Sequence, residues 1–133
     1  MTIVLDSCTA IEIILNREKA GELKEILNSA DEIVTSSLYR IEVANVLLKY
    51  YKGGFIEKNT CDKLLTLAEN LIDDFVDISE NNHEALKEAI RLNHSTYDML
   101  FLTLSRSRDA KLLTLDERLK KLAEQENIKY FTL

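Results

Sequence analysis

Short, almost wholly apolar runs recur along this chain, and segments with helical spacing of their apolar residues separate them. The runs are too short and too uniformly apolar for a sheet with one face in water, so they predict strands that are buried on both faces. The predicted strands are Thr2–Leu5, Glu32–Thr35, Phe75–Ile78, Lys111–Leu115 and Lys129–Thr132.

Between these runs, apolar residues recur every three or four positions, which predicts helices. The predicted helices are Ser7–Leu15, Lys19–Asn28, one that Ser36 or Ser37 caps and that stops at Gly53–Gly54, Glu57–Ile72, Asn82–Leu92, one that opens near Ser95, and Asp116–Glu126. The alternation predicts a single α/β domain over residues 1–133, with three α/β/α layers around a central parallel sheet of about five short strands.

One predicted helix carries a carboxylate where burial would disfavour it. The stretch Tyr97–Leu104 is apolar on every side, as in a buried helix, yet Asp98 lies near its start. A buried charge is costly unless a partner neutralises it, so Asp98 indicates a functional site. A simpler interpretation stays open, because Ser95 and Asp98 have the spacing of a helix capping box.

Three further acids fall where a parallel α/β sheet gathers its ligands. Asp6 ends the first predicted strand, Asp116 follows the fourth, and Glu42 lies one to two turns into the helix after the second. Because the ends of parallel strands line one edge of the sheet, we expect these acids to lie close to Asp98. Asp116 also has a simpler interpretation as the N-cap of the helix that follows it.

Four neighbouring carboxylates raise one another's pKa, and a divalent cation removes that cost. An all-oxygen ligand set selects Mg²⁺ or Mn²⁺ over Zn²⁺. One or two such ions clamp a phosphate, activate water for in-line attack and stabilise the leaving oxygen. The pattern therefore predicts phosphodiester hydrolysis at a metal site formed by Asp6, Glu42, Asp98 and Asp116.

Composition narrows the setting in which such a protein works. The 133 residues are 46% hydrophobic and 30% charged, with no apolar run long enough to span a membrane and no basic leader. Cys8 and Cys61 form no metal-binding pattern and predict free, buried thiols in a reducing cytoplasm. The net charge of −6 argues against nucleic acid, but setting four metal-binding acids aside from 23 leaves 19 against 17 basic residues.

The motifs around the four acids resemble those of PIN-domain nucleases. They are V-L-D-S at Val4–Ser7, R-I-E-V at Arg40–Val43, T-Y-D-M-L-F-L-T-L at Thr96–Leu104 and L-L-T-L-D at Leu112–Asp116. In length and order the chain is most similar to the VapC toxins of toxin–antitoxin pairs. The resemblance covers nearly the whole chain and implies a metal-dependent endoribonuclease whose acidic ligands fall on the four residues named above.

The same resemblance implies supporting groups and partners. Thr114 and Ser7 match hydroxyl positions beside the acids, where they would orient a carboxylate or a metal-bound water. The implied partners are an RNA substrate, a second copy in a homodimer and a small antitoxin that blocks the site. The chain departs from the family pattern after the buried helix, where Ser105 and the charged Arg106–Asp109 replace small residues.

Three alternatives compete with this interpretation. A phosphoacceptor receiver domain also gathers Mg²⁺-binding acids, but it pairs acids after its first strand, where this chain has Ser7 and Cys8. A phosphatase of the haloacid-dehalogenase type requires an acid two residues after Asp6, and Cys8 occupies that position. The third alternative is a protein of the same fold that binds a partner without catalysis.

Other charged residues are interpreted from their positions. Glu12 is expected on an exposed helix face, and Asp73–Asp74 precede a strand, which predicts a solvated turn at the opposite edge of the sheet. His94 is close to Asp98, but a histidine just before a helix is more often a surface residue, so we assign it no role. The basic residues that flank the acids are candidates to contact RNA phosphates: Arg40, Lys49, Lys52, Arg106, Arg108 and Lys111.

Overall fold

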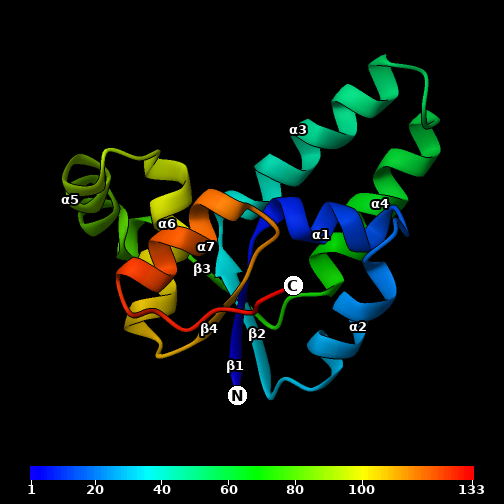
Figure 1. The fold of residues 1–133 in the computed structure, drawn as a ribbon. Coiled ribbons are helices and arrows are strands. Elements are labelled where there is room, and N and C mark those ends of the chain that lie inside the picture. Colours follow the sequence, from blue (N-terminus) through cyan, green and yellow to red (C-terminus); the bar gives the residue numbers. More distant parts are fainter.

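The computed structural model describes residues 1–133 and contains four strands and seven α-helices (Figure 1). The strands are β1 (Thr2–Leu5), β2 (Glu32–Ser36), β3 (Asp74–Val76) and β4 (Lys111–Leu113). The helices are α1 (Ser7–Ile14), α2 (Ala20–Asn28), α3 (Leu38–Lys52), α4 (Lys58–Asn70), α5 (Asn82–Leu92), α6 (Thr96–Ser107) and α7 (Glu117–Gln125), with a short 3₁₀ helix, η1 (Ile78–Glu80), before α5. None of them combines the length and the apolar character needed to cross a lipid bilayer.

The four strands are all parallel and lie in the order β3-β2-β1-β4. The chain winds outward from β1 through β2 to β3 and then returns to the other side of β1, so the direction of winding reverses between β1 and β4. Open α/β sheets bind their ligands at such a reversal, outside the carboxyl ends of the strands. Asp6 follows β1 and Asp116 follows β4, so the backbone brings both acids to this position.

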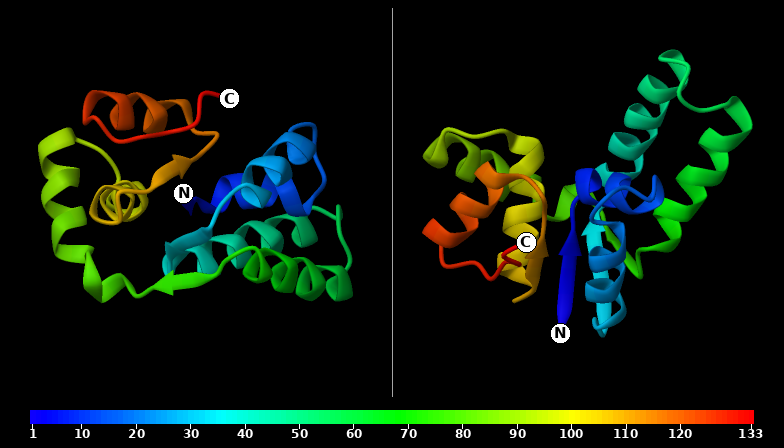
Figure 2. Two further views of the ribbon diagram at one scale, coloured as in Figure 1. Left: turned by 90° about the horizontal axis from the view of Figure 1, so that it is seen from below. Right: turned by 45° about the vertical axis from the view of Figure 1, so that its right-hand side comes forward.

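Helices cover both faces of the sheet, which confirms the predicted three-layer fold. Figure 2 shows α5 and α6 on one side of the strands and α1, α2 and α4 on the other. The apolar strands are buried as a result, and Ile3, Val4 and Leu5 of β1 have no exposed surface. The α3–α4 hairpin extends away from the sheet (Figure 1).

Helix α6 is buried from Met99 to Ser105, because it lies between the sheet and α5. Its internal hydroxyls are satisfied within the helix, since Thr103 and Ser105 donate to the carbonyls of Met99 and Phe101 at 2.7 and 2.9 Å. The first turn differs from the prediction, because Tyr97 is 62% exposed and the Asp98 side chain is 34% exposed. Asp98 therefore lies at the accessible end of a buried helix.

The predicted fifth strand is wrong, because the last residues form only an isolated parallel bridge between Leu112 and Tyr130. Leu112 donates to the Lys129 carbonyl at 2.9 Å and accepts from the Phe131 amide at 3.1 Å. Because β4 itself is short, no ladder extends from this bridge. The sheet accordingly has four strands.

Candidate active site

Asp6 lies between β1 and α1 and is buried. Its carboxylate caps α1 by accepting the Thr9 N–H at 3.0 Å, and its other oxygen accepts the Thr114 hydroxyl. Burial raises the pKa of Asp6 above its ordinary value, the bonds from Thr114 and Thr9 oppose the rise, and the charge of Asp98 adds to it. The acid is thus held in one orientation next to another negative charge.

Two threonines tie the β1–α1 junction to the β4–α7 junction. The Thr114 hydroxyl, which donates to Asp6, accepts the Asp116 N–H at 3.1 Å. In the same way, the Thr9 hydroxyl accepts the Leu115 N–H at 3.1 Å. Two segments more than a hundred residues apart in sequence are therefore joined side by side.

Asp116 is the N-cap of α7, as its simpler interpretation states. Its Oδ1 accepts the backbone N–H groups of Arg118 and Leu119 at 2.9 and 3.4 Å. These bonds leave Oδ2 without a hydrogen-bond donor from the protein. Capping and ion binding use different oxygens, so the first does not exclude the second.

Glu42 projects from α3 toward α1, where the Ser7 hydroxyl donates to its Oε1 at 2.8 Å. Burial raises the pKa of Glu42 above its ordinary value; the Ser7 bond opposes this, and the charges of Asp98 and Asp6 add to it. Ser7 therefore lies beside an acid of the predicted set, as the resemblance implied. Three acids from α3, α6 and the end of β1 are electrostatically coupled.

Asp98 is not part of a capping box, because Ser95 caps α6 by accepting the Tyr97 N–H at 3.1 Å while the Asp98 carboxylate lies elsewhere. Its Oδ2 is 2.9 Å from Nε2 of His94. Only 6% of the His94 side chain is exposed, so the expectation of a surface residue is wrong. The sequence signal for this contact is the spacing of four residues between His94 and Asp98, which span the start of α6.

Cys8, in the first turn of α1, lies within the field of all four acids. Although the residue is exposed, loss of water around its sulfur raises the pKa of the thiol to about 11, and the charges of Asp6, Glu42, Asp98 and Asp116 add to the rise. The charges of four acids from four segments therefore act on this one thiol. Both cysteines are free as predicted, but neither is fully buried, since Cys61 is half-buried.

The donor set suits a hard divalent cation. Three carboxylates keep one oxygen that accepts no hydrogen bond from the protein, namely Oε2 of Glu42, Oδ1 of Asp98 and Oδ2 of Asp116. No three acidic, histidine or cysteine side chains lie close enough together to hold a metal ion by themselves. Mg²⁺ retains several waters and takes only one or two carboxylates directly, so this open arrangement fits it.

Most of the predicted RNA-contacting residues are wrongly placed. Arg106 and Arg108 lie at the far end of α6, about 12 to 15 Å from Asp98 along the helix axis, and Lys111 lies at the start of β4. Each has a local partner: Arg106 pairs with Glu84, Arg108 lies 3.6 Å from Asp74, and Lys111 lies 4.2 Å from the centre of the Phe131 ring. Arg40 pairs with Glu69 and lies over the Phe75 ring at 3.7 Å. Lys49 and Lys52 remain exposed on α3.

The two acids assigned to the opposite edge are found there, but Asp74 is the first residue of β3 and not part of a turn before it. Asp73 precedes β3, donates its N–H to the Ile33 carbonyl at 2.8 Å and accepts the Ile33 N–H at 2.8 Å. Glu12 is half-buried and accepts the Lys19 N–H at 3.2 Å, so it supports the start of α2 and takes no part in the acidic site.

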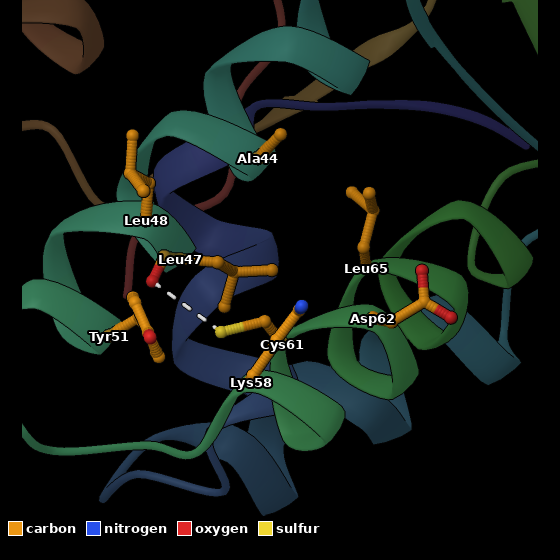
Figure 3. A pocket seen from close by; sticks show the side chains of 8 residues that line it. All are labelled: Ala44, Leu47, Leu48, Tyr51, Lys58, Cys61, Asp62 and Leu65. Atoms are coloured by element: carbon orange, nitrogen blue, oxygen red, sulfur yellow. Dashed lines mark hydrogen bonds between the residues drawn. The ribbon is translucent and has the colours of Figure 1, made fainter.

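Sequence reasoning missed a second surface, an apolar groove of about 440 Å³ between α3 and α4 (Figure 3). It is lined by Ala44, Leu47, Leu48, Tyr51, Lys58, Cys61, Asp62 and Leu65. Leu48 and Tyr51 are 45% and 46% exposed, so large apolar side chains face the solvent along this groove. The sequence feature that indicates this groove is the pair Leu47-Leu48. Two adjacent leucines point to different sides of a helix, so only one of them can face the core.

Comparisons with known proteins agree with this architecture. A family model described as the PIN domain matches residues 3–125. Ribonuclease VapC3 of Pyrobaculum aerophilum is 28% identical over 124 residues, which cover 90% of this chain and 92% of that protein. Among solved structures, VapBC2 of Rickettsia felis, bound to a DNA fragment from its promoter, matches 100% of this chain and 99% of that chain with a TM-score of 0.72 and 16% identity. A toxin–antitoxin complex from Klebsiella pneumoniae matches 86% of each chain with a TM-score of 0.59 and 16% identity, and at such identities the shared feature is the fold.

Proposed function

Because this chain belongs to the PIN-domain family, we propose that it is a cytoplasmic, metal-dependent endoribonuclease that acts as the toxin of a toxin–antitoxin pair. The observation that carries the proposal is the set of hydrogen bonds at the carboxyl edge of the sheet, where Thr114 links the segments that carry Asp6 and Asp116 and Ser7 links Glu42 to α1. The ribonuclease named above, which is 28% identical over nearly the whole chain, supports RNA as the substrate.

The four acids are the proposed ligands of Mg²⁺ or Mn²⁺. Held by these residues, the ion would supply the positive charge that phosphodiester hydrolysis needs at the phosphate and at the attacking and leaving oxygens. The chain's own part is to hold the carboxylates in place: Ser7 holds Glu42, and Thr9 and Thr114 hold Asp6. Lys49, two turns beyond Glu42 on the same face of α3 and exposed, is the remaining predicted cation best placed to contact an RNA phosphate.

The proposed partner in the α3–α4 groove is an apolar segment of the antitoxin. The groove exposes large apolar side chains next to the helix that carries Glu42, so a protein bound there lies close to the acidic site. The similar toxin–antitoxin complex supports a partner of this kind. Helix α5 offers a separate apolar face for the homodimer, since Leu86 and Ile90, one turn apart, are 53% and 74% exposed.

The test is to incubate the purified protein, free of antitoxin, with a structured RNA in Mn²⁺, in Mg²⁺ or in EDTA. We expect cleavage with either metal and none in EDTA, read as discrete fragments on a denaturing gel. Cleavage that survives EDTA contradicts metal dependence. Binding of Mn²⁺ without cleavage of any RNA tested would instead favour the alternative of a non-catalytic binding protein.

A further inference from the structure

The four acids share one arrangement, in which a dedicated hydrogen-bond donor holds each carboxylate. Thr9 and Thr114 hold Asp6, Ser7 holds Glu42, and the first backbone amides of α7 hold Asp116. Asp98 differs from the other three acids in the type of its partner, because its only hydrogen-bond partner is the ring of His94. This histidine lies in the turn between α5 and α6.

The backbone around His94 is held in place by the end of α5. Asn93 adopts the left-handed conformation with φ of 52°, and the His94 N–H donates to the Ala89 carbonyl at 3.0 Å, as in a helix C-cap. The imidazole is almost fully enclosed, with 6% of the side chain exposed. Its position is therefore set by the turn and by packing, independently of Asp98.

The second ring nitrogen faces a cationic side chain. Nη2 of Arg118 lies 3.5 Å from Nδ1 of His94, and a guanidinium can only donate, so this contact favours a ring without a proton on Nδ1. In that tautomer Nε2, which is 2.9 Å from Oδ2 of Asp98, carries the proton and donates to the carboxylate. The backbone N–H of Arg118 also donates to Oδ1 of Asp116 at 2.9 Å. Arg118 therefore contacts Asp116 directly and, through the ring of His94, is linked to Asp98.

We propose that His94 is the positioning residue of Asp98 and that Arg118 holds its ring in the tautomer that donates from Nε2. The inference rests on the proposed function, because it assigns Asp98 as a metal ligand. Holding Oδ2 fixes the orientation of the carboxylate and leaves Oδ1, which has no donor from the protein, available as a ligand. Donors behind a ligand matter because their removal typically lowers metal affinity or activity by about 10- to 100-fold.

The test compares two substitutions of similar reach. His94→Gln keeps an N–H donor near the position of Nε2, whereas His94→Phe fills the same space without a donor. Binding of Mn²⁺ alone, followed by the electron paramagnetic resonance of the free ion, is measured for each variant and for the wild type. We expect His94→Phe to raise the dissociation constant of Mn²⁺ by about 10-fold or more and His94→Gln to remain within about 3-fold of the wild type.

A purely structural role predicts a different result, in which both variants lose stability and affinity together. Circular dichroism and the melting temperature of each variant separate these cases. Equal Mn²⁺ affinity of the wild type and a folded His94→Phe overturns the inference, and so does a loss in His94→Gln as large as that in His94→Phe. RNA cleavage is followed in parallel, and we expect kcat to fall in His94→Phe with little change in KM.

The ring tautomer gives a readout that depends on neither metal nor activity. Nitrogen-15 spectra of the wild type are expected to show the proton of His94 on Nε2, and Arg118→Leu, which retains the backbone amide to Asp116, is expected to release the second tautomer. A proton on Nδ1 in the wild type overturns the inference even if the protein is a nuclease. If the wild type binds no Mn²⁺ and cleaves no RNA, the proposed function fails, and the tautomer alone decides whether His94 holds Asp98.

Discussion

The carboxyl edge of the sheet and the α3–α4 groove are two exposed surfaces with opposite chemistry. At the edge, burial and mutual repulsion raise the pKa of Asp6 and Glu42, so the acids favour a cation among them. In the groove, Leu48 and Tyr51 expose apolar surface that favours burial against a partner. Each surface is unfavourable without its ligand, and each selects a different kind of ligand.

Helix α3 takes part in both surfaces. Glu42 meets Ser7 of α1 at the acidic edge, whereas Leu47 and Leu48 line the groove. A single helix can do this because residues five or six positions apart point in different directions around its axis. We therefore expect substitutions to separate metal-dependent cleavage from partner binding, although both depend on one helix.

The largest expected effect breaks the acidic edge alone. Asp98→Asn removes one negative ligand at nearly constant size, and the loss of several kcal/mol of transition-state stabilisation lowers the rate of RNA cleavage by about 1,000-fold. Because Asp98 does not line the groove, the affinity for the antitoxin should stay unchanged. Single-turnover cleavage and a binding titration measure the two quantities, and cleavage within about 10-fold of the wild type would contradict the assignment of Asp98.

A somewhat smaller effect breaks the groove alone. Leu48→Asp places a charge on its apolar lining and is expected to weaken antitoxin binding by about 30- to 100-fold, which corresponds to a hot-spot residue. RNA cleavage by the free protein should not change. Leu67→Asp is the matched control, since Leu67 lies on α4, is 52% exposed and does not line the groove. Equal affinities of both variants would argue against the groove as the docking surface.

The smallest expected effect concerns the stability cost of the acids at the carboxyl edge. The pKa of Glu42 is raised in the folded protein, mainly by burial, so the folded state holds its proton more tightly than the unfolded chain does. Stability from this group is therefore present below the ordinary carboxyl pKa and is lost as pH rises through the folded pKa. In EDTA at pH 7, the Glu42→Gln variant should therefore be more stable than the wild type, with a free energy of unfolding that is higher by up to about 1 kcal/mol.

Denaturant titrations at pH 5 and pH 7 measure this difference, which should shrink at the lower pH as Glu42 takes up its proton. Saturating Mn²⁺ should reverse the order, because the ion stabilises the folded wild type more than the variant. A Glu42→Gln protein that is less stable than the wild type at pH 7 in EDTA would show that repulsion among the acids is not a net cost.

Local pattern predicted the elements of this fold closely. The limits of β1 and α5 match the predicted ranges, because an apolar run and a helical repeat are properties of neighbouring residues. The parallel direction of the strands and the position of Asp6 and Asp116 at their carboxyl ends followed from general rules of chain winding. The predicted strand at Lys129–Thr132 failed because pairing requires a partner strand long enough to continue the ladder, and β4 is short.

The side-chain partners at the site escaped prediction for another reason. His94 was judged by its place before a helix, yet the angle between α5 and α6 encloses its ring and directs it to Asp98. Arg106 and Arg108 were judged by closeness in sequence to Asp98, but a helix carries its two ends far apart. Where a site is formed by the ends of helices, a short separation in sequence therefore does not predict that two side chains lie close together in space.

The sequence by itself determined where the strands and helices lie and that acids stand at their ends, because hydrophobic periodicity and chain reversal act locally. Only the tertiary structure decided that Thr114 meets Asp6, that His94 meets Asp98 and that α3 and α4 leave an apolar groove open between them. These features depend on the packing angles of elements distant in sequence, which balance burial of the whole core and which no single segment encodes.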